Sequence, residues 1–580
     1  MTFFQLKPGT YQFSHWAYGR FLGLVALIAF LSYWHQADAL IGDNGLSPWT
    51  KDLANIQNLV DQNPDLNKWT IRPTLLWFDW LSNHHLLFAT GTLSAALLTI
   101  GIVPALCALI SYTCYLSLMV VGEPFLSFQW DALLCEALLL SLPFLPLCKF
   151  HKFGTSYKTP VLARYLIICL LAKLMLESGI VKFTSFGENN QNTWSDLTAL
   201  NFHYWTQPLP HGLSPWIDSL PAWLDQFSLI FMYATELILP IFLFFPGNLR
   251  RIALIGQILL QVIILASGNY GFFNLLTLCL CIPLIDDQWI SRFFTNNPAQ
   301  EPSENNNPLW NNSFGWFPAA TLHWIVLYIC WALFVPTTYG HFLRDLRGNS
   351  PKPLVDQQPP QWVNDFTLFV RPSHAFNSYG LFRVMTTTRP EIIIEGSLDG
   401  ETWRPYSFLY KPTDPDETPR FAGVHMPRID WQMWFEGLSY ERYAKHSFSC
   451  MLYHKFLETS ARGGGVEDFK NFGEVIGQVE YQQFIQSPPQ VKQRILENYN
   501  SLLHAFSSRS LWFGNLLEAI FEHRKEVMVH LDESLEALPP PNHLRVSLAH
   551  YQFAPTEHNS SKTQIWEVTP IEGASLIISK

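Results

Sequence analysis

The chain has 580 residues, a formal net charge of −10 and only 14% charged residues, whereas soluble globular proteins carry about 25%. This composition excludes a disordered chain, a nucleic-acid binder with a basic face and a simple soluble enzyme. The charges are unevenly spread, because 33 lie in residues 1–340 and 51 lie in the shorter stretch 341–580. We therefore expect a membrane-embedded first part and a water-exposed second part.

Long apolar segments recur through residues 1–340. A bilayer core requires about 20 apolar residues per helix, and the run 86–121 is long enough for two helices, with Gly101 and Pro104 at the expected break. The pattern predicts a polytopic, α-helical integral membrane protein with about nine transmembrane helices. Their expected positions are 21–34, two helices within 86–121, 131–147, 161–181, 227–245, 252–266, 271–285 and 318–336.

Two short basic loops indicate the orientation of this bundle. Loop 148–160 contains three lysines and no acidic residue, and loop 246–251 contains two arginines. Short loops rich in Lys and Arg stay in the cytoplasm. With nine helices the N-terminus is then cytoplasmic, and everything after about residue 337 is extracytoplasmic. That side is the periplasm in a bacterium and the endoplasmic-reticulum lumen in a eukaryote.

The second part of the chain divides into a connector and a folded domain. Residues 341–365 are rich in proline and predict an extended connector. Residues 366–580 are expected to form a β-rich extracytoplasmic domain, because β-branched and aromatic residues mark strands in 380–410. A helical insertion is expected at about 488–535, where apolar residues recur every three or four positions. Further strands are expected at 544–553 and 564–568.

Ionisable residues in the apolar segments are candidates for function, because a charge in the bilayer core is costly. Asp131 and Glu136 are five positions apart on one helix, which separates their carboxylates by about 140°. We therefore do not expect them to converge as a catalytic pair. Asp131 is placed to cap the helix N-terminus, whereas Glu136 needs a partner from elsewhere.

A second group of ionisable residues lies in the stretch LLAKLMLESGIVKF. Lys173 and Glu177 are four positions apart on one helix face and are expected to pair. Ser178 and the glycine after it allow another helix to approach closely. Lys182 has two interpretations, because it either extends to the membrane surface or is a desolvated amine that acts as a base.

The segment 191–216 is dense in Asn, His, Trp, Gln and Pro and includes His203, Gln207 and Pro208. We expect it to form an amphipathic loop that lies on the membrane surface and closes the bundle. His203 has no acidic or thiolate partner at ligand spacing, so no metal site is expected. Two polar residues that are expected to form hydrogen bonds between helices are Asn269 and Asn274.

Familiar signatures of soluble catalysis are missing from the sequence. It contains no GxSxG, no GxxxxGK[ST], no HExxH and no GxGxxG at a strand–helix turn. CxxC is also missing, which disfavours a thiol oxidoreductase. We therefore expect no cofactor.

Several long strings of residues resemble the lipase maturation factor family. They are WDALLCE (130–136), SGIVK (178–182), DLTALNFHYWTQPLP (196–210), GNYGFFNLLTLCLCIPLIDD (268–287), NSYGLFRVMTTTRPEIIIEGSLDGETW (377–403), PRIDWQMWF (427–435) and LRVSLAHYQF (544–553). The resemblance implies a membrane protein that helps secreted dimeric lipases to fold and assemble. Animal members reside in the endoplasmic reticulum, with the C-terminal domain in the lumen. The implied partners are an exported client, such as a lipase, and membrane lipid, and not nucleic acid.

The sequence departs from the family pattern in a few positions. Leu138 stands where the family usually has glycine, and Lys173 and Glu177 stand in place of Arg and Gly. The outer part of the chain contains a single cysteine, Cys450. The scarcity of cysteine suggests a bacterial member of the family in an inner membrane.

One functional interpretation is a membrane-anchored folding and maturation factor that resembles a chaperone more than an enzyme. In this interpretation the outer domain offers Trp431 and Trp434 to its client, while Arg428 and Asp430 fix the local geometry. The alternative for these tryptophans is that WQMWF is a buried strand, because tryptophan is more often part of a core than of a binding surface.

The alternative interpretation is an intramembrane enzyme. The string SGIVKF, followed by a Trp-containing segment, resembles the helix end that carries the catalytic lysine of vitamin K-dependent gamma-carboxylases. This second resemblance implies an enzyme that acts on a lipid, a quinone or an exported protein. Lys182 would be its base, and Asp131 and Glu136 would line the same cavity. A third interpretation is a structural membrane scaffold in which no single charge is decisive.

Overall fold

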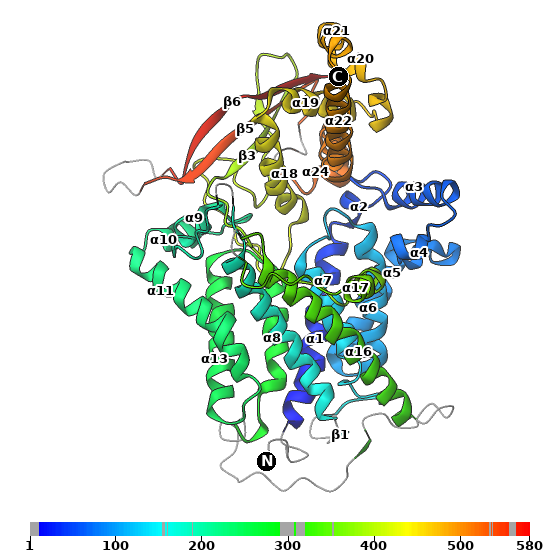
Figure 1. Cartoon of the computed structure of the whole chain (residues 1–580), viewed down its shortest axis with the longest axis vertical. Coiled ribbons are helices and arrows are strands. Elements are labelled where there is room, and N and C mark those ends of the chain that lie inside the picture. The colour runs from blue at the N-terminus through cyan, green and yellow to red at the C-terminus, as the bar shows by residue number, and fades with distance from the viewer. Residues whose placement is uncertain are drawn as a thin grey trace.

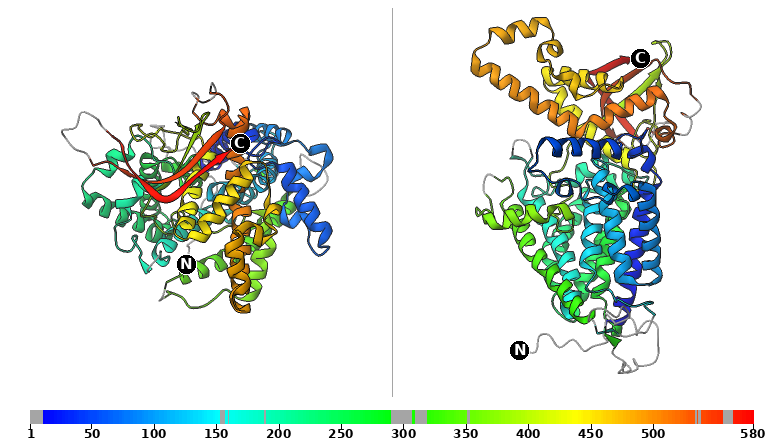
Figure 2. Two further views of the ribbon diagram at one scale, coloured as in Figure 1. Left: turned by 90° about the horizontal axis from the view of Figure 1, so that it is seen from above. Right: turned by 90° about the vertical axis from the view of Figure 1, so that its right-hand side faces the viewer.

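The computed structural model describes residues 11–152, 157–158, 160–187, 190–289, 307–308, 319–350, 353–532, 535, 538–555 and 564–580. Within them the chain forms a tall bundle of helices with a smaller C-terminal region on one end (Figure 1, Figure 2). The middle of the basic loop 148–160 lies outside the described residues.

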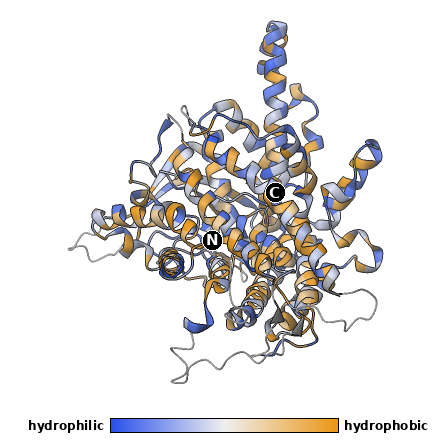
Figure 3. Ribbon diagram, turned by 60° about the horizontal axis from the view of Figure 1, so that its bottom comes forward, coloured by the Kyte–Doolittle hydropathy of each residue, from blue (hydrophilic) through white to orange (hydrophobic). Residues whose placement is uncertain are grey.

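Each of the nine predicted apolar segments contains a helix of the bundle, and hydrophobic residues dominate these helices (Figure 3). The predicted break in the run 86–121 is confirmed. One helix ends at Ile100, Gly101 follows in the left-handed conformation, and the next helix begins at Pro104. The helices are α1 (Gln12–Trp34), α5 (His84–Ile100), α6 (Pro104–Val121), α7 (Gln129–Leu140), α8 (Val161–Thr184), α11 (Ala222–Tyr233), α12 (Leu239–Phe242), α13 (Asn248–Ser267), α14 (Phe273–Cys281) and α16 (Ala319–Arg347).

Among the described residues, five helices are long and apolar enough to cross a membrane. They are Gln12–Trp34, Pro104–Val121, Ala222–Phe242, Asn248–Ser267 and Thr321–Arg347. The apolar helices His84–Ile100 and Phe273–Leu284 are shorter, and α8 is 24 residues long but contains four ionisable residues. The structure therefore contains a membrane domain with several apolar helices, and the count of nine spans stays a prediction.

Short helices lie around the end of the bundle that faces the C-terminal region (Figure 1). They come from the loops between the long helices and from the residues after α16. They are α2 (Ala37–Leu40), α3 (Trp49–Gln62), α4 (Lys68–Ile71), α9 (Leu200–Thr206), α10 (Ser214–Asp218) and α17 (Gln361–Val370).

The C-terminal region contains one small antiparallel sheet, in the strand order β4-β3-β5-β6. The run of three isoleucines in β3 pairs with β5, so that Ile392 lies opposite Leu548 and Ile394 opposite Val546. The strands are β3 (Pro390–Ser397), β4 (Arg404–Pro405), β5 (His543–Phe553) and β6 (Trp566–Ser579). The helices between β4 and β5 are α18 (Arg428–Ala444), α19 (Ser447–Ala461), α20 (Phe472–Ile476), α21 (Gln478–Gln486), α22 (Pro489–Arg509), α23 (Leu511–Glu522) and α24 (Lys525–Met528).

This region differs from the β-rich domain that the sequence predicts for 366–580. Helices begin at Arg428, about 60 residues before the expected insertion 488–535, so the region is a small sheet with many helices. WQMWF lies in α18 and not in a strand. The helix was not evident from the sequence, because its residues are buried on nearly every side and show no helical period. The strand at 544–553 is confirmed, and the predicted connector 341–365 begins and ends with helical residues.

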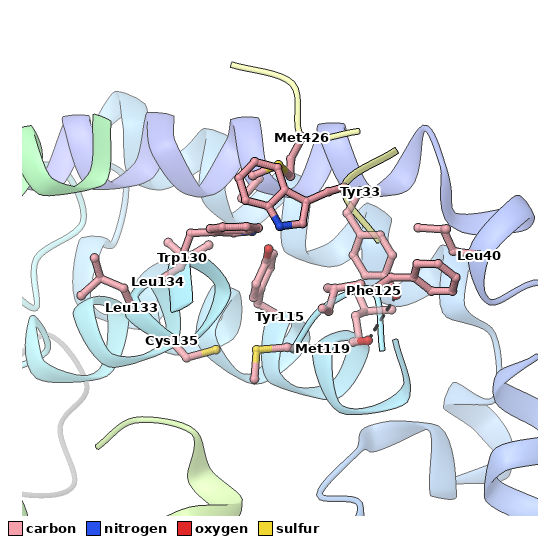
Figure 4. Close-up of a cluster of buried hydrophobic side chains, with 14 of the residues drawn as sticks. Tyr33, Leu40, Tyr115, Met119, Phe125, Trp130, Leu133, Leu134, Cys135 and Met426 are labelled. Carbon is pink, nitrogen blue, oxygen red and sulfur yellow. Dashed lines mark hydrogen bonds between the residues drawn. The ribbon is translucent and has the colours of Figure 1, made fainter. Parts of the chain in front are cut away.

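One continuous hydrophobic core extends from the bundle into the C-terminal region. At the junction Tyr33, Tyr115, Phe125 and Trp130 of the bundle side pack around Met426 from the C-terminal region (Figure 4). The two parts therefore share buried apolar surface, and the side chains that join them are the natural place to look for a site.

Candidate functional site

The junction contains a fully buried ion pair between Asp131 of α7 and Arg428 of α18. Both side chains have 0% exposure, and the guanidinium donates to the two carboxylate oxygens at 2.6 and 2.7 Å. The Tyr115 hydroxyl donates to the same carboxylate at 2.6 Å. Burial alone would lower the pKa of Arg428, but the charge and hydrogen bonds of Asp131, together with the nearby hydroxyls of Tyr115 and Tyr33, outweigh burial and raise that pKa above its ordinary value. Asp131 therefore binds a residue of the C-terminal region and does not cap its own helix as predicted.

Tryptophans pack beside this ion pair. Trp431 meets Trp130 in a T-shaped contact with ring centroids 4.9 Å apart, and the exposed fractions of the two residues are 2% and 0%. Trp434 is 6% exposed and donates its indole N–H to the Thr206 carbonyl at 2.8 Å. Both Trp431 and Trp434 are therefore buried in the domain junction, and they do not form the client-facing surface expected from the sequence.

Asp430 fixes a loop of the C-terminal region. Its carboxylate accepts the backbone N–H groups of Tyr410 and Lys411 at 2.8 and 3.0 Å. Burial raises the pKa of Asp430 to about 6, although these hydrogen bonds oppose the shift. Together with Arg428, Asp430 gives α18 the geometric role that the sequence predicted for it.

A second buried contact holds a segment of the C-terminal region, residues 375–381, against the bundle. One oxygen of Glu136 accepts from Lys173 of α8 at 2.9 Å. The other oxygen accepts the Tyr379 hydroxyl at 2.6 Å and the backbone N–H of Asn377 at 3.0 Å. Glu136 thus has the distant partner it needs. As predicted, its contacts do not converge with those of Asp131.

Two more side chains of the bundle bind the same segment. Glu177 accepts the Tyr379 backbone N–H at 2.8 Å, and Gln129 accepts the Gly380 N–H at 2.9 Å. A Cβ at Gly380 would press on Val181 of α8, so this close approach requires glycine. The prediction that Glu177 pairs with Lys173 is wrong, because the Lys173 ammonium forms its ion pair with the Glu136 carboxylate.

Arg389 at the start of the sheet holds the loop that contains Pro208. Its guanidinium donates to the carbonyls of Trp205, Gln207 and Pro208. Its charge is balanced by Glu391, which lies 2.7 Å away and also pairs with a lysine. The C-terminal region therefore contacts the loop 191–216 through Arg389, and the position of this loop on the membrane surface stays a prediction.

Hydrogen bonds around Gln207 determine the tautomer of His203. The Gln207 amide nitrogen donates to the carbonyls of Tyr204 and Ser267, so its oxygen must accept from the Tyr270 hydroxyl, 2.8 Å away. Tyr270 then accepts from His203 Nε2 at 3.0 Å. Burial lowers the pKa of His203 to about 4, so the ring is neutral and its Nδ1 is an acceptor.

The other polar candidates form hydrogen bonds inside the protein. Asn274 donates to Gln261 of the neighbouring helix at 2.8 Å, as predicted. Asn269 instead bridges the bundle and the C-terminal region, because it donates to the Arg420 carbonyl at 2.9 Å and accepts a backbone N–H from the same segment. Ser178 donates to a carbonyl of its own helix.

Lys182 forms a buried ion pair with Glu236. Its ammonium donates to both carboxylate oxygens at 2.8 Å and to the Ser178 carbonyl at 3.3 Å. Lys182 is 7% exposed and Glu236 5%, so Lys182 does not extend to the membrane surface. Glu236 lies in a π-helical turn, Ala234–Ile238, that interrupts the helix from α11 to α12. The pair borders a cavity of about 380 Å³.

Asp38, His84 and His85 are the only group of described residues with three potential metal-binding atoms within 4.8 Å of one another. The indole N–H groups of Trp49 and Trp34 donate to Nδ1 of His84 and His85, respectively. Because indole is only a donor, each imidazole carries its proton on Nε2. Both Nε2 atoms lie 3.2 Å from the Asp38 carboxylate, so their protons point toward it. A metal ion could bind these nitrogens only if it displaced the protons.

The five ionisable candidates do not converge on one pocket among the described residues. Asp131 pairs with Arg428, Glu136 with Lys173 and Lys182 with Glu236, whereas Glu177 shares Tyr379 with Glu136. Several of these partners were not predicted from the sequence. For Glu236 a signal was available, because it is a lone carboxylate in the apolar segment 227–245. The partners that sequence reasoning did not single out are Gln129, Glu236, Asn377, Tyr379, Gly380 and Arg389. The arrangement fixes the C-terminal region on the bundle, and it gives Asp131, Glu136 and Lys182 each an oppositely charged partner.

Comparison with known proteins gives the family of the chain. Residues 13–292 match the model of the lipase maturation factor transmembrane domain, and residues 375–465 match that of the lipase maturation factor C-terminal domain. These ranges contain both partners of each ion pair at the junction. The chain is therefore a membrane protein by family and by its apolar helices.

Individual relatives agree with these matches. The chain is 31% identical to lipase maturation factor 2 of Gallus gallus, with 72% of this chain and 69% of the relative covered. For lipase maturation factor 2 of Homo sapiens the identity is 30%, with 71% and 70% covered. For lipase maturation factor 1 of Mus musculus it is 27%, with 78% of each chain covered. No solved structure matches the chain. The chain belongs to the lipase maturation factor family.

Proposed function

We propose that the protein is a membrane-anchored maturation factor that assists the folding of an exported lipase. The observation that carries this proposal is the membership of its family, combined with a C-terminal region that is fixed to the bundle by the buried Asp131–Arg428 ion pair and by the hydrogen bonds of Tyr379 to two bundle carboxylates. A folding factor needs a rigid surface at the membrane where its client emerges. The buried junction holds the C-terminal region in a fixed position on the bundle, so that this region can offer such a surface.

In this proposal nine helices cross the membrane, with the N-terminus in the cytoplasm and the C-terminal region outside. The basic loop 148–160 supports this orientation, because β1 (Tyr157–Lys158) within it lies at the end of the bundle opposite the C-terminal region (Figure 1). Residues 246–251, which lead from α12 into the first turn of α13, are also basic. Membrane lipid then surrounds the bundle as its second partner.

The client-facing surface is the arm formed by α20, α21 and α22. The arm projects beyond the rest of the C-terminal region (Figure 2). It exposes apolar side chains that the fold does not use, and a segment of an incompletely folded client can cover them. The exposed fractions are 68% for Val479, 45% for Ile485, 45% for Val491 and 38% for Leu496.

Co-expression with a secreted lipase tests the proposal. Cells that lack other lipase maturation factors would express the lipase with this chain, without it, or with the variant Arg428→Ala. The proposal expects active secreted lipase only with the intact chain. An unrelated secreted enzyme serves as the control. An equal gain for that enzyme, or no gain for the lipase, would overturn the proposal.

The alternative function, an intramembrane enzyme of the gamma-carboxylase-like type, has one observation in its favour. Lys182 lies beside a cavity, as a catalytic base would. However, its three N–H groups are taken by Glu236 and Ser178, whereas a base needs a free lone pair. Lys182→Arg separates the two functions, because it keeps the charge but cannot act as a base. Retained lipase maturation favours the maturation factor, and its complete loss with a folded protein favours the enzyme.

A further inference from the structure

We propose that the cavity between α11 and α13 binds the acyl chain of a bilayer glycerolipid. This inference goes beyond the proposed function in lipase maturation, because it assigns a lipid ligand to the membrane domain.

The cavity arises from the divergence of two helices. The turn Ala234–Ile238 and α12 pack against α13, whereas α11 packs against α9. Figure 1 shows α11 leaning away from α13 toward the C-terminal region. The resulting wedge is the cavity of about 380 Å³ beside Lys182 and Glu236. Its size falls in the range of small-molecule sites, about 300–1,000 Å³.

Apolar side chains form most of the walls. Leu229 and Met232 of α11 and Leu260 of α13 line the interior, and their exposed fractions are only 1%, 9% and 4%. Apolar walls of this kind favour apolar molecules over water. An acyl chain fits such walls, whereas a polar metabolite would leave its hydrogen bonds unsatisfied.

The mouth of the cavity opens on the side of the bundle that faces lipid. Ile263 lines the cavity and is 40% exposed. Apolar side chains around this mouth continue onto the outer surface of both helices, where Phe227 is 61% exposed, Ile230 56% and Ile255 56%. Both helices belong to segments that are apolar enough to cross a membrane. A lipid chain can therefore move from the bilayer into the wedge without crossing water.

The charges of the cavity favour an uncharged ligand. The Lys182 ammonium is neutralised by Glu236, so it leaves no cation for a fatty-acid carboxylate. Asp225 adds a carboxylate to the lining, and it accepts the Tyr204 hydroxyl at 3.0 Å. His203 also lines the cavity. Its Nδ1 is an acceptor without a partner among the described residues. The lone pairs of such acceptors repel an anionic head group, so the cavity favours a lipid without net negative charge.

Photolabelling of the full chain tests the proposal. The protein is reconstituted into phosphatidylcholine vesicles that contain a phosphatidylcholine with a diazirine at the end of one acyl chain, and labelled residues are mapped by mass spectrometry. We expect labels on the buried residues Leu229, Met232 and Leu260 in addition to exposed ones. Labels confined to exposed positions such as Phe227 and Ile255 would overturn the proposal.

A matched pair of variants sharpens the test. Leu229→Trp fills the cavity, whereas Phe227→Trp changes the outer face of the same helix. We expect the first variant to reduce labelling of Met232 by about tenfold, which corresponds to about 1.4 kcal/mol of binding free energy, and the second to leave it unchanged. Equal labelling of both variants would contradict the site. A diazirine fatty acid that labels Met232 while the phospholipid does not would overturn the assignment to a glycerolipid. If Leu229→Trp does not fold, the label map of the unchanged protein decides alone.

Discussion

Arg428 and Asp131 are 297 positions apart in the sequence, yet they form a two-pronged ion pair with no exposure to water. One partner begins α18 of the C-terminal region, and the other lies in the first turn of α7 in the bundle. A buried ion pair adds little when both partners are present, but removal of one leaves a buried charge without compensation. The loss of one partner should therefore cost more than the loss of both.

We expect Arg428→Ala or Asp131→Ala to destabilise the folded protein by about 3–5 kcal/mol. The double variant Arg428→Met with Asp131→Leu should lose less than either single change, because it leaves no unpaired charge. The midpoint of thermal unfolding in detergent measures the effect. The exposed pair Arg462 and Glu458 is the matched control, since its removal should cost at most about 1 kcal/mol. Equal losses at the two sites would contradict this account of the junction.

Glu436 of α18 should make stability depend on pH. Burial raises its pKa to about 7, although the hydroxyls of Tyr453 and Ser510 and the Trp512 side chain oppose the shift. The folded state thus holds a proton that the unfolded chain releases near pH 4.3. Its contribution is therefore present at low pH and is lost as pH rises from about 4 to 7, by a free energy on the order of 3 kcal/mol.

The variant Glu436→Gln isolates this effect, because its side chain stays neutral at every pH. We expect its unfolding midpoint to rise relative to the unchanged protein between about pH 4 and pH 7, the span in which the contribution of the protonated Glu436 is lost. Glu458→Gln, at an exposed position of α19, should show no such trend. A flat difference for Glu436→Gln would mean that the carboxyl does not titrate in this range.

Gly437 should tolerate no side chain. A Cβ at this position of α18 would overlap the carbonyl of Pro390 at the start of β3, and backbone cannot rotate away as a side chain can. We expect Gly437→Ala to lower the free energy of unfolding by about 1–3 kcal/mol. Gly465→Ala is the control, because nothing lies within 4 Å of the added Cβ. Unfolding midpoints of the two variants decide the matter.

The arm of α20 to α22 should carry the client without supporting the fold. We expect the double change Val479→Ser and Ile485→Ser to leave the unfolding midpoint unchanged, because both side chains are largely exposed. The amount of active lipase secreted on co-expression should fall. Gln483→Ala with Gln493→Ala changes exposed polar residues of the same arm as a control. Undiminished lipase secretion with the serine variant would remove the arm from the proposed function.

The sequence located the helices of the bundle well, because an apolar run of about 20 residues is a local signal. It failed for the partners of the buried charges. The spacing of Lys173 and Glu177 permits a pair on one helix, but the approach of α7 offers Lys173 the carboxylate of Glu136 instead. That approach depends on contacts with Tyr379, more than 200 positions away. Helix-surface rules contain no information about such contacts.

The C-terminal region was harder to predict for a different reason. A buried strand and a helix that is buried on all sides both lack a clear apolar period in the sequence. Around Trp431 and Trp434, α18 is a helix of this type. The sequence allowed two interpretations of these tryptophans, a buried position and a client-facing one. The choice between them required the position of Trp130, which only the folded chain provides.

The segment 375–381 has a consequence for biosynthesis. Glu136 and Glu177 enter the membrane long before the ribosome reaches Tyr379, whose hydroxyl and backbone N–H they accept. Until then the nascent bundle carries carboxylates that lack part of their hydrogen bonding in an apolar setting. A product that terminates before residue 375 would keep this defect permanently and expose it to membrane quality control. The buried hydrogen bonds of the half that was made first are therefore complete only after the C-terminal half has been made.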